Sequence, residues 1–288
     1  MAAPSSEIAL SASDVEAFVS EVRSQGARLY RDLPWRYIDD PYQVLVSEVM
    51  LQQTQVSRVL KYWPEFLRRF PTVDALAAAS VGAVLETWQG LGYNRRALAL
   101  KRACEYCSAH HGGKLPESYE ELIALDGVGP ATAAGVRAFA FHQPGVYLET
   151  NVRTVYIHHF FPGEEKVSDK VLGSLVKQTC PEQDVIGWYY ALLDYGAHLK
   201  STVGNLNRRS KSYTRQSTFE GSKRQKRAFL VRCVLDEPGI DLKGLQALLD
   251  EEELKAKREA VDPAFLQELL DQLCAEGFFS CQDGRYFS

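Results

Sequence analysis

Helical periodicity is the feature that most limits what this chain can fold into. Through the first 227 residues, apolar residues recur at the spacing of an α-helix between short breaks, and no alternating β pattern persists for long. Asp40 and Pro41 form a helix start, an N-cap followed by proline in the first turn, and the helical pattern runs on to Met50. We therefore expect this part of the chain to be all α.

Two serine–glutamate pairs predict further helix starts. Ser13 with Glu16 fits a capping box that opens a helix running to about Leu29, and Ser118 with Glu121 fits another.

The last 60 residues carry a different pattern. Helical patterns at Phe229–Leu235, Leu242–Leu249 and Phe265–Cys274 are followed by two short aromatic-rich runs on either side of Asp283 and Gly284. An Asp-Gly pair in this position is a strong hairpin signal. Three helices with a terminal hairpin predict a small winged-helix-like module. Because this segment is acidic, a structural or protein-contact role is favoured over DNA binding.

Length and composition limit the class of protein. A chain of 288 residues favours two domains over one, and 45% hydrophobic with 24% charged residues describes a folded chain. No run of about 18 apolar residues occurs, and Met1–Leu10 lacks a basic segment followed by an apolar stretch. Six scattered cysteines agree with a reducing compartment. The sequence thus predicts a cytoplasmic protein with no membrane partner, associated with the nucleoid if its source is bacterial.

The net charge of −4 hides an asymmetry along the chain. Ala228–Ser288 carries 13 acidic and 6 basic residues, which leaves a positive balance for the part before it. The run from Arg208 to Arg227 is strongly basic, with Glu220 as its one acid. Such a run suits a polyanion, because each phosphate contact releases counterions. The alternative is a solvated linker between domains.

The stretch from Leu125 to Gly135 predicts a tight turn between two helices. Gly127 and Gly129 flank one apolar residue, and small residues follow Pro130. A helix beginning near Pro130 points unpaired N–H groups outward, which makes an anion site for a DNA phosphate. Carbonyl oxygens of such a hairpin can also hold a monovalent cation. The alternative is a plain turn packed against protein.

A carboxylate among apolar residues marks a second informative stretch. Glu48 lies between Ser47 and Val56 beside several amides. A carboxyl group with mostly apolar neighbours has a raised pKa, as a general acid near neutral pH requires. The alternative for Glu48 is a solvated helix position.

Five segments appear in the order and approximate spacing of one family: Pro34–Arg36, Asp40–Tyr42, Ser47–Val56, Trp88–Tyr93 and Leu125–Gly129. The chain resembles the A/G-specific adenine DNA glycosylases of the helix-hairpin-helix superfamily, over about Leu33–Leu199. The resemblance implies a two-lobed, mainly helical core that flips a base out of duplex DNA and hydrolyses its glycosidic bond.

The resemblance also implies roles for three residues. Glu48 matches the glutamate that protonates the departing base and orients water. Glu149 stands where the family has an aspartate that stabilises the positive charge on the deoxyribose, so a carboxylate remains but is one methylene longer. Asn151 matches an asparagine that helps to place water or substrate.

Further residues are expected to contact DNA. Gln52 and Gln53 lie where the family inserts a wedge through the minor groove, and a neighbouring loop can contact the DNA backbone. The full expected set is Gln52, Gln53, Tyr93, Asn94, Arg95, Arg96, Gly127, Gly129, Ala131, Thr132, Lys223, Arg224, Lys226 and Arg227.

Three departures from the family shape the expected activity. Ala131 replaces the lysine that attacks the sugar in bifunctional relatives, which favours a monofunctional glycosylase. Lys200–Arg227 contains no cysteine where most relatives have four, so no iron–sulfur cluster or other metal is expected. Asn94 follows Tyr93 where the adenine enzymes have a second tyrosine, and the tail does not fit their Nudix-like domain.

The expected organisation has four parts. A hairpin-containing lobe covers residues 32–145, a second lobe combines 1–31 with 146–206, a basic connector covers 207–227, and the winged-helix-like module covers 228–288. We expect a monomer that excises a mispaired or damaged base from double-stranded DNA, with adenine as the favoured base. The alternatives are a glycosylase for thymine or uracil mispaired with guanine, and a non-catalytic binder of DNA structure.

Overall fold

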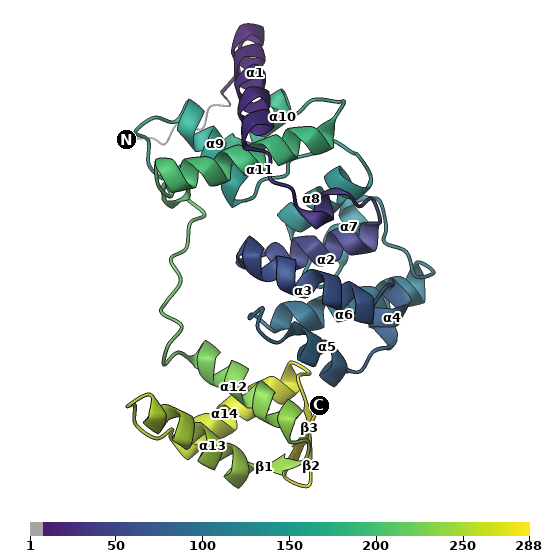
Figure 1. The fold of residues 1–288 in the computed structure, drawn as a ribbon, viewed down its shortest axis with the longest axis vertical. Helices are drawn as coiled ribbons and strands as arrows, with labels where there is room; N and C mark the ends of the chain where they lie inside the picture. Colours follow the sequence, from purple (N-terminus) through teal and green to yellow (C-terminus); the bar gives the residue numbers. More distant parts are fainter. Residues whose placement is uncertain (1–7) are drawn as a thin grey trace. The chain divides into compact units, whose positions relative to one another are not determined.

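The chain forms two compact, mainly helical units in a computed structural model that describes residues 8–288 (Figure 1). The first unit takes the chain up to Glu48 together with Leu115–Arg215, and the second takes Val49–Lys114 together with Gln216–Ser288. The expected all-α character of the first 227 residues is confirmed. The four parts expected from the sequence follow other boundaries and stay a prediction, and residues 1–7 of the expected second lobe lie outside the described residues.

The first unit is helical throughout its described residues, apart from an isolated bridge between Val167 and Ser210. Its core is built on α11, which packs against α1 and α9. Gly26 of α1 lies so close to α11 that a Cβ there would overlap Ala191, so a glycine is required at this crossing. The elements are α1 (Ala12–Leu29), η1 (Pro34–Arg36), α2 (Pro41–Leu51, whose last three residues belong to the second unit), α7 (Tyr119–Ala124), α8 (Pro130–Ala140), α9 (Thr150–Phe160), α10 (Asp169–Thr179), α11 (Val185–Thr202) and η2 (Leu206–Arg209).

A buried ion pair ties the segment before α2 to α11. Asp194 is 2% exposed and accepts hydrogen bonds from both Nη atoms of Arg36, at 2.8 and 2.7 Å. Arg31 donates to the same carboxylate at 2.5 Å, and the Arg36 guanidinium lies over the Tyr190 ring, 4.4 Å from its centroid. Since an unpaired charge here would be costly, this network fixes where α2 begins.

Helix starts follow the sequence signals with one correction. Ser118 caps α7 by accepting the Glu121 N–H, and Asp40 accepts the Gln43 N–H at the start of α2, both as predicted. The predicted pair of Ser13 and Glu16 is wrong. The capping box is formed two residues earlier by Ser11 and Asp14, because the Asp14 carboxylate reaches back to the Ser11 N–H at 3.2 Å.

The second unit begins with four helices in which α6 packs against α4 and α5, and α3 packs against α5. They are α3 (Val56–Arg69), α4 (Val73–Ala78), α5 (Val81–Trp88) and α6 (Arg95–His110). Trp88 is fully buried with its ring edge-on to Phe66. Cys104 and Cys107 are buried on α6, and burial raises the pKa of both thiols, so they are core residues.

The predicted winged-helix-like tail is confirmed. Its elements are α12 (Lys223–Asp236), β1 (Ile240–Asp241), α13 (Leu242–Lys255), α14 (Pro263–Ala275), β2 (Ser280–Gln282) and β3 (Arg285–Phe287). The strands pair antiparallel in the order β1-β3-β2. Asp283 and Gly284 both have positive φ, 50° and 73°, as a two-residue hairpin turn of this type requires. Because α12 begins at Lys223, the end of the expected connector is helical.

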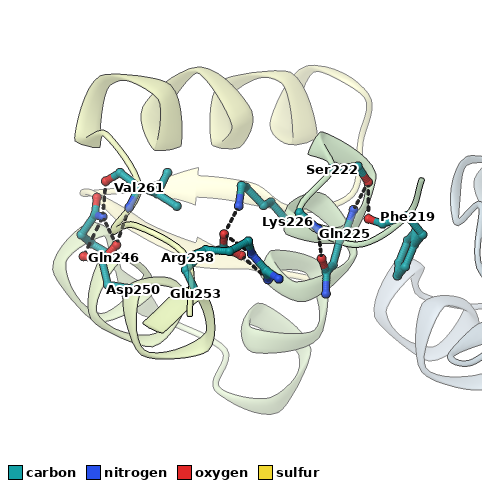
Figure 2. Close-up of polar contacts among 10 residues, drawn as sticks. Phe219, Ser222, Gln225, Lys226, Gln246, Asp250, Glu253, Arg258 and Val261 are labelled. Carbon is teal, nitrogen blue, oxygen red and sulfur yellow. Dashed lines mark hydrogen bonds and ion pairs between the residues drawn. The ribbon is translucent and has the colours of Figure 1, made fainter. Parts of the chain in front are cut away.

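An ion network around Glu253 holds the tail together (Figure 2). The Glu253 side chain is 3% exposed and accepts hydrogen bonds from Arg258 Nε and Nη2, at 2.8 and 2.9 Å, while Lys226 of α12 forms an ion pair with the same carboxylate. These cations lower the pKa of Glu253 to about 2. Lys226 therefore has a structural partner inside the module.

No helix within residues 8–288 combines the length and the apolar character needed to cross a membrane.

Candidate active site

Glu48 lies on α2 in the setting that a general acid needs. Its carboxylate accepts a hydrogen bond from the Tyr147 hydroxyl, 3.5 Å away, and the residue keeps partial access to solvent. Burial raises the pKa of Glu48 to about 8, with a smaller contribution from the charge of Glu149. A carboxyl group with this pKa is mostly protonated at neutral pH and can give its proton away.

Gly135 makes room for this carboxylate. A Cβ on Gly135 would overlap Glu48 Oε2 and would lie 3.0 Å from Tyr147 Cε2. The glycine is buried in the middle of α8, where its backbone freedom has no evident use. The run of small residues after Pro130 was the sequence signal for a close approach, but it did not indicate that the approaching group is Glu48.

Replacing Gly135 with alanine is expected to lower the rate of the base excision predicted from the sequence at least tenfold, because the new methyl group displaces the Glu48 carboxyl. Single-turnover rates measure this effect. Gly145→Ala is the matched control, since a Cβ at that position meets nothing within 4 Å. Equal rates for the two variants would contradict the assigned role of Gly135.

Glu149 is the N-cap of α9. Its Oε1 accepts the N–H groups of Asn151 at 2.7 Å and of Val152 at 3.3 Å. Burial raises the pKa of Glu149, and these two N–H donors together with Arg153 oppose that shift. Glu48 instead accepts a long hydrogen bond from the Tyr147 hydroxyl. The two environments favour a neutral Glu48 and an anionic Glu149.

The structure brings both predicted carboxylates and Asn151 into one region of the first unit. The charge of Glu149 acts on the pKa of Glu48, and Asn151 follows Glu149 in the first turn of α9. A Cβ on Gly196 of α11 would overlap the Asn151 carbonyl oxygen, so this turn is held close against α11. The roles of Glu48, Glu149 and Asn151 in a reaction stay predictions.

An aromatic cluster that sequence reasoning missed surrounds Glu48. The Tyr147 ring is edge-on to Phe139 and to Tyr189, with centroids 5.4 and 5.2 Å apart, and Phe139 stacks on Tyr190 at 4.9 Å. Burial raises the pKa of Tyr190, and the nearby Glu48 adds to this shift. Tyr147 lies against the Glu48 carboxyl and belongs to this aromatic cluster, so apolar rings contribute to the burial that raises the pKa of Glu48. No sequence signal pointed to Tyr147.

The predicted turn between two helices is present as α7, a five-residue turn and α8. Gly127 has φ of 72°, and Gly129 is the N-cap of α8 with open space where a Cβ would stand. Ala131 and Thr132 lie in the first turn of α8. This end of α8 has the geometry of an anion site, and contact with a phosphate or a cation stays a prediction.

The expected wedge residues, Gln52 and Gln53, lie in a turn of the second unit whose backbone is stabilised by the side chain of Arg96. Its guanidinium donates to the carbonyl oxygens of Val49, Met50 and Gln52 at 2.7, 3.0 and 2.6 Å, and to that of Gly92 at 3.0 Å. Burial lowers the pKa of Arg96 to about 10, so it stays charged at neutral pH. Arg96 therefore positions the turn that carries Gln52 and Gln53; direct DNA contact by Arg96 stays a prediction.

The other cationic candidates differ in their partners. Arg95 forms a two-point ion pair with Glu276, which also pairs with Arg227. Lys223 pairs with the exposed Glu268, and Arg224 donates to the Tyr93 hydroxyl at 2.9 Å. Asn94 is the N-cap of α6. The structure thus assigns internal partners to several residues that the sequence indicated as DNA contacts.

Comparison with known proteins places these features in a wider group. Residues 46–179 match the family described as HhH-GPD superfamily base excision DNA repair protein. The chain is 32% identical to the adenine DNA glycosylase of Buchnera aphidicola subsp. Baizongia pistaciae over 66% of this chain and 56% of the relative. It is 46% identical to the adenine DNA glycosylase of Mycobacterium tuberculosis over 44% of this chain and 42% of the relative. The chain spans about half the length of the curated relatives it matches.

Two solved structures share the fold. A thermostable thymine-DNA glycosylase is similar with a TM-score of 0.57 and 24% identity, over 64% of this chain and 86% of that one. Endonuclease III in a non-covalent DNA complex is similar with a TM-score of 0.58 and 17% identity, over 67% of this chain and 90% of that one. The expected fold class, a mainly helical glycosylase core with a winged-helix-like tail, is confirmed.

Proposed function

We propose that the chain is a DNA glycosylase that removes a flipped base from duplex DNA, with adenine as the favoured base, because residues 46–179 match the HhH-GPD superfamily of base excision DNA repair proteins and the chain is similar to adenine DNA glycosylases. The observation that carries this proposal is the pair of largely buried carboxyl groups in unlike environments, both with partial access to solvent. Glu48 has a pKa of about 8, and Glu149 accepts two backbone N–H groups. One acid and one anion are what hydrolysis of a glycosidic bond needs.

The reaction proceeds by proton transfer and charge stabilisation. Glu48 gives its proton to the departing base as the bond between base and sugar breaks, and the bonding electrons leave with the base. Glu149 stabilises the positive charge that develops on the deoxyribose. Water then attacks the sugar carbon and passes its proton to the Glu48 carboxylate, which restores the acid. The products are a free base and an abasic site.

The absence of a lyase step is part of the proposal. Ala131 offers no amine at the position of the lysine that attacks the sugar in bifunctional relatives, so no Schiff base forms there. Borohydride added during turnover is expected to trap no covalent protein–DNA complex. A trapped complex would show a lyase activity and contradict this part.

A panel of duplexes tests the proposed activity. Each carries one candidate: adenine opposite 8-oxoguanine or guanine, thymine or uracil opposite guanine, or an alkylated base. Alkali-labile breaks at adenine are the expected result. Breaks only at thymine or uracil would assign the mismatch activity instead. Binding without release of any base would indicate a non-catalytic DNA binder.

The basic run also enters the proposal, as a phosphate-contacting segment. Replacing Lys223 and Arg224 together with alanine is expected to weaken DNA binding and to reduce the slope of log K against log salt by about 2, or 0.9 for each lost phosphate contact. Lys243→Ala with Lys255→Ala removes the same charge from α13 and is the control. An unchanged slope would make the run a linker. Lys226 and Arg227 are left intact because they pair with Glu253 and Glu276.

A further inference from the structure

Gln216, in the segment before α12, joins the turn that carries the expected wedge residues. Its side-chain Nε2 donates to Gln53 Oε1, and its Oε1 accepts from the Tyr93 hydroxyl at 2.5 Å. Arg224 donates to the same Tyr93 hydroxyl at 2.9 Å and lies over the Tyr93 ring, 5.7 Å from its centroid. All four residues belong to the second unit. Two amides and one hydroxyl thus form a single polar cluster.

Two members of this cluster have strained backbones. Gln53 has φ of 53° and Tyr93 has φ of 50°, a region that residues with a side chain rarely adopt. Both strained positions carry the side chains that meet Gln216. Strained backbone conformations persist where the surrounding structure stabilises them, and they are frequent at functional sites. Here Arg96 stabilises both strained turns by donating hydrogen bonds to the carbonyl oxygens of Gln52 and Gly92, the residues before Gln53 and Tyr93.

The cluster faces solvent. Gln53 and Gln216 are exposed, and Tyr93 is 37% exposed. The core therefore gains little from these side chains, since exposed hydrogen bonds contribute little net stability. A carboxamide offers both donors and an acceptor, so a pair of them can bind the edge of a base that has lost its partner. Flipping one base leaves such an edge in the opposite strand.

We propose that Gln216 is a specificity-determining residue that acts with Gln53 to read the base opposite the extruded one. This rests on the proposed function. No sequence signal indicates this role, because Gln216 lies 163 residues from Gln53 and only the fold brings the two amides together.

Binding to product-like DNA tests the proposal without any chemistry. Full-length protein is titrated against four duplexes that carry a tetrahydrofuran abasic analogue opposite A, C, G or T. The wild-type protein is expected to bind one of them more tightly than the others. Gln216→Ala is expected to reduce that preference about tenfold, the value of one good contact to a base edge. Gln53→Ala should act on the same preference, and the double variant should lose no more than either single one.

Ser217→Ala is the matched control, because it changes the neighbouring exposed side chain and keeps the carbonyl that accepts from Arg224. Four outcomes overturn the proposal: wild-type binding that ignores the opposite base, an unchanged preference in Gln216→Ala, an equal loss on all four duplexes, or tighter binding to all four. Tighter binding to all four duplexes would mean that Gln216 covers the turn that carries Gln52 and Gln53 and hinders DNA binding. A preference lost in Gln216→Ala, in a protein that excises no base, would uphold this inference and reject the proposed glycosylase.

Discussion

Glu48→Gln is expected to lower the single-turnover rate of base excision by about 10²- to 10⁴-fold, the usual value of a general acid. The change keeps the shape of the side chain and removes the proton that the departing base takes. DNA affinity should stay within a few-fold of the wild type, because a Glu48 carboxyl with a pKa of about 8 is mostly uncharged at neutral pH and glutamine is uncharged as well. A rate equal to that of the parent on every duplex would mean that Glu48 is not the acid.

The same variant is expected to be more stable than the wild type at neutral pH. The pKa of Glu48 is about 8 in the folded chain against 4.5 for an ordinary glutamate. The folded state thus holds the proton more tightly, and stability falls as pH rises from about 4.5 to about 8. At pH 7 the cost is on the order of 3 kcal/mol, and glutamine does not incur it. Thermal unfolding at pH 5 and pH 7.5 measures the difference, which should be small at pH 5 and larger at pH 7.5.

Glu149→Gln is expected to lower excision by about 100-fold or more, because the sugar cation loses its stabilising anion. Glutamine keeps the side-chain oxygen that accepts the N–H groups of Asn151 and Val152, so the cap of α9 should survive. Single-turnover rates with unfolding curves separate charge from structure.

Glu149→Ala and Glu149→Asp complete this series. Alanine removes both the charge and the cap and should cost about a further 1 kcal/mol of stability. Aspartate keeps the charge but moves it, so its rate should lie between those of Glu149→Gln and the wild type. If Glu149→Gln excises as fast as the wild type, charge at this position has no part in the reaction.

Local sequence signals predicted much of the fold. The starts of α2 and α7 follow from Asp40 and Ser118, and the terminal hairpin follows from Asp283 and Gly284, since each signal acts within a few residues. The start of α1 was placed wrongly at Ser13 because two serines compete there. Only the reach of Asp14 back to the Ser11 N–H decides between them.

Motifs indicated Glu48 and Glu149, whose roles in a reaction stay predictions. The residues around Glu48 could not be predicted, because Tyr147 and Gly135 approach it through contacts across the first unit that no spacing reveals. Long cationic side chains were hardest to place. Arg96 binds backbone carbonyls inside the second unit, because a guanidinium can satisfy several of them at once.

The sequence also does not show which acidic residues pair with the basic run. Lys226 and Arg227 look like phosphate contacts by charge alone, but the acidic tail folds back to offer them Glu253 and Glu276. The charge pattern of a sequence shows where the charged residues lie along the chain but not which of them form ion pairs.

The pH dependence of single-turnover excision tests most directly whether a protonated Glu48 drives the reaction. Under saturating protein, the wild-type rate should be level near pH 7 and fall tenfold per pH unit above an apparent pKa of about 8, the value for Glu48. The residual rate of Glu48→Gln should show no such fall. A wild-type rate that stays level to pH 9.5, or a fall that persists in Glu48→Gln, would contradict the account.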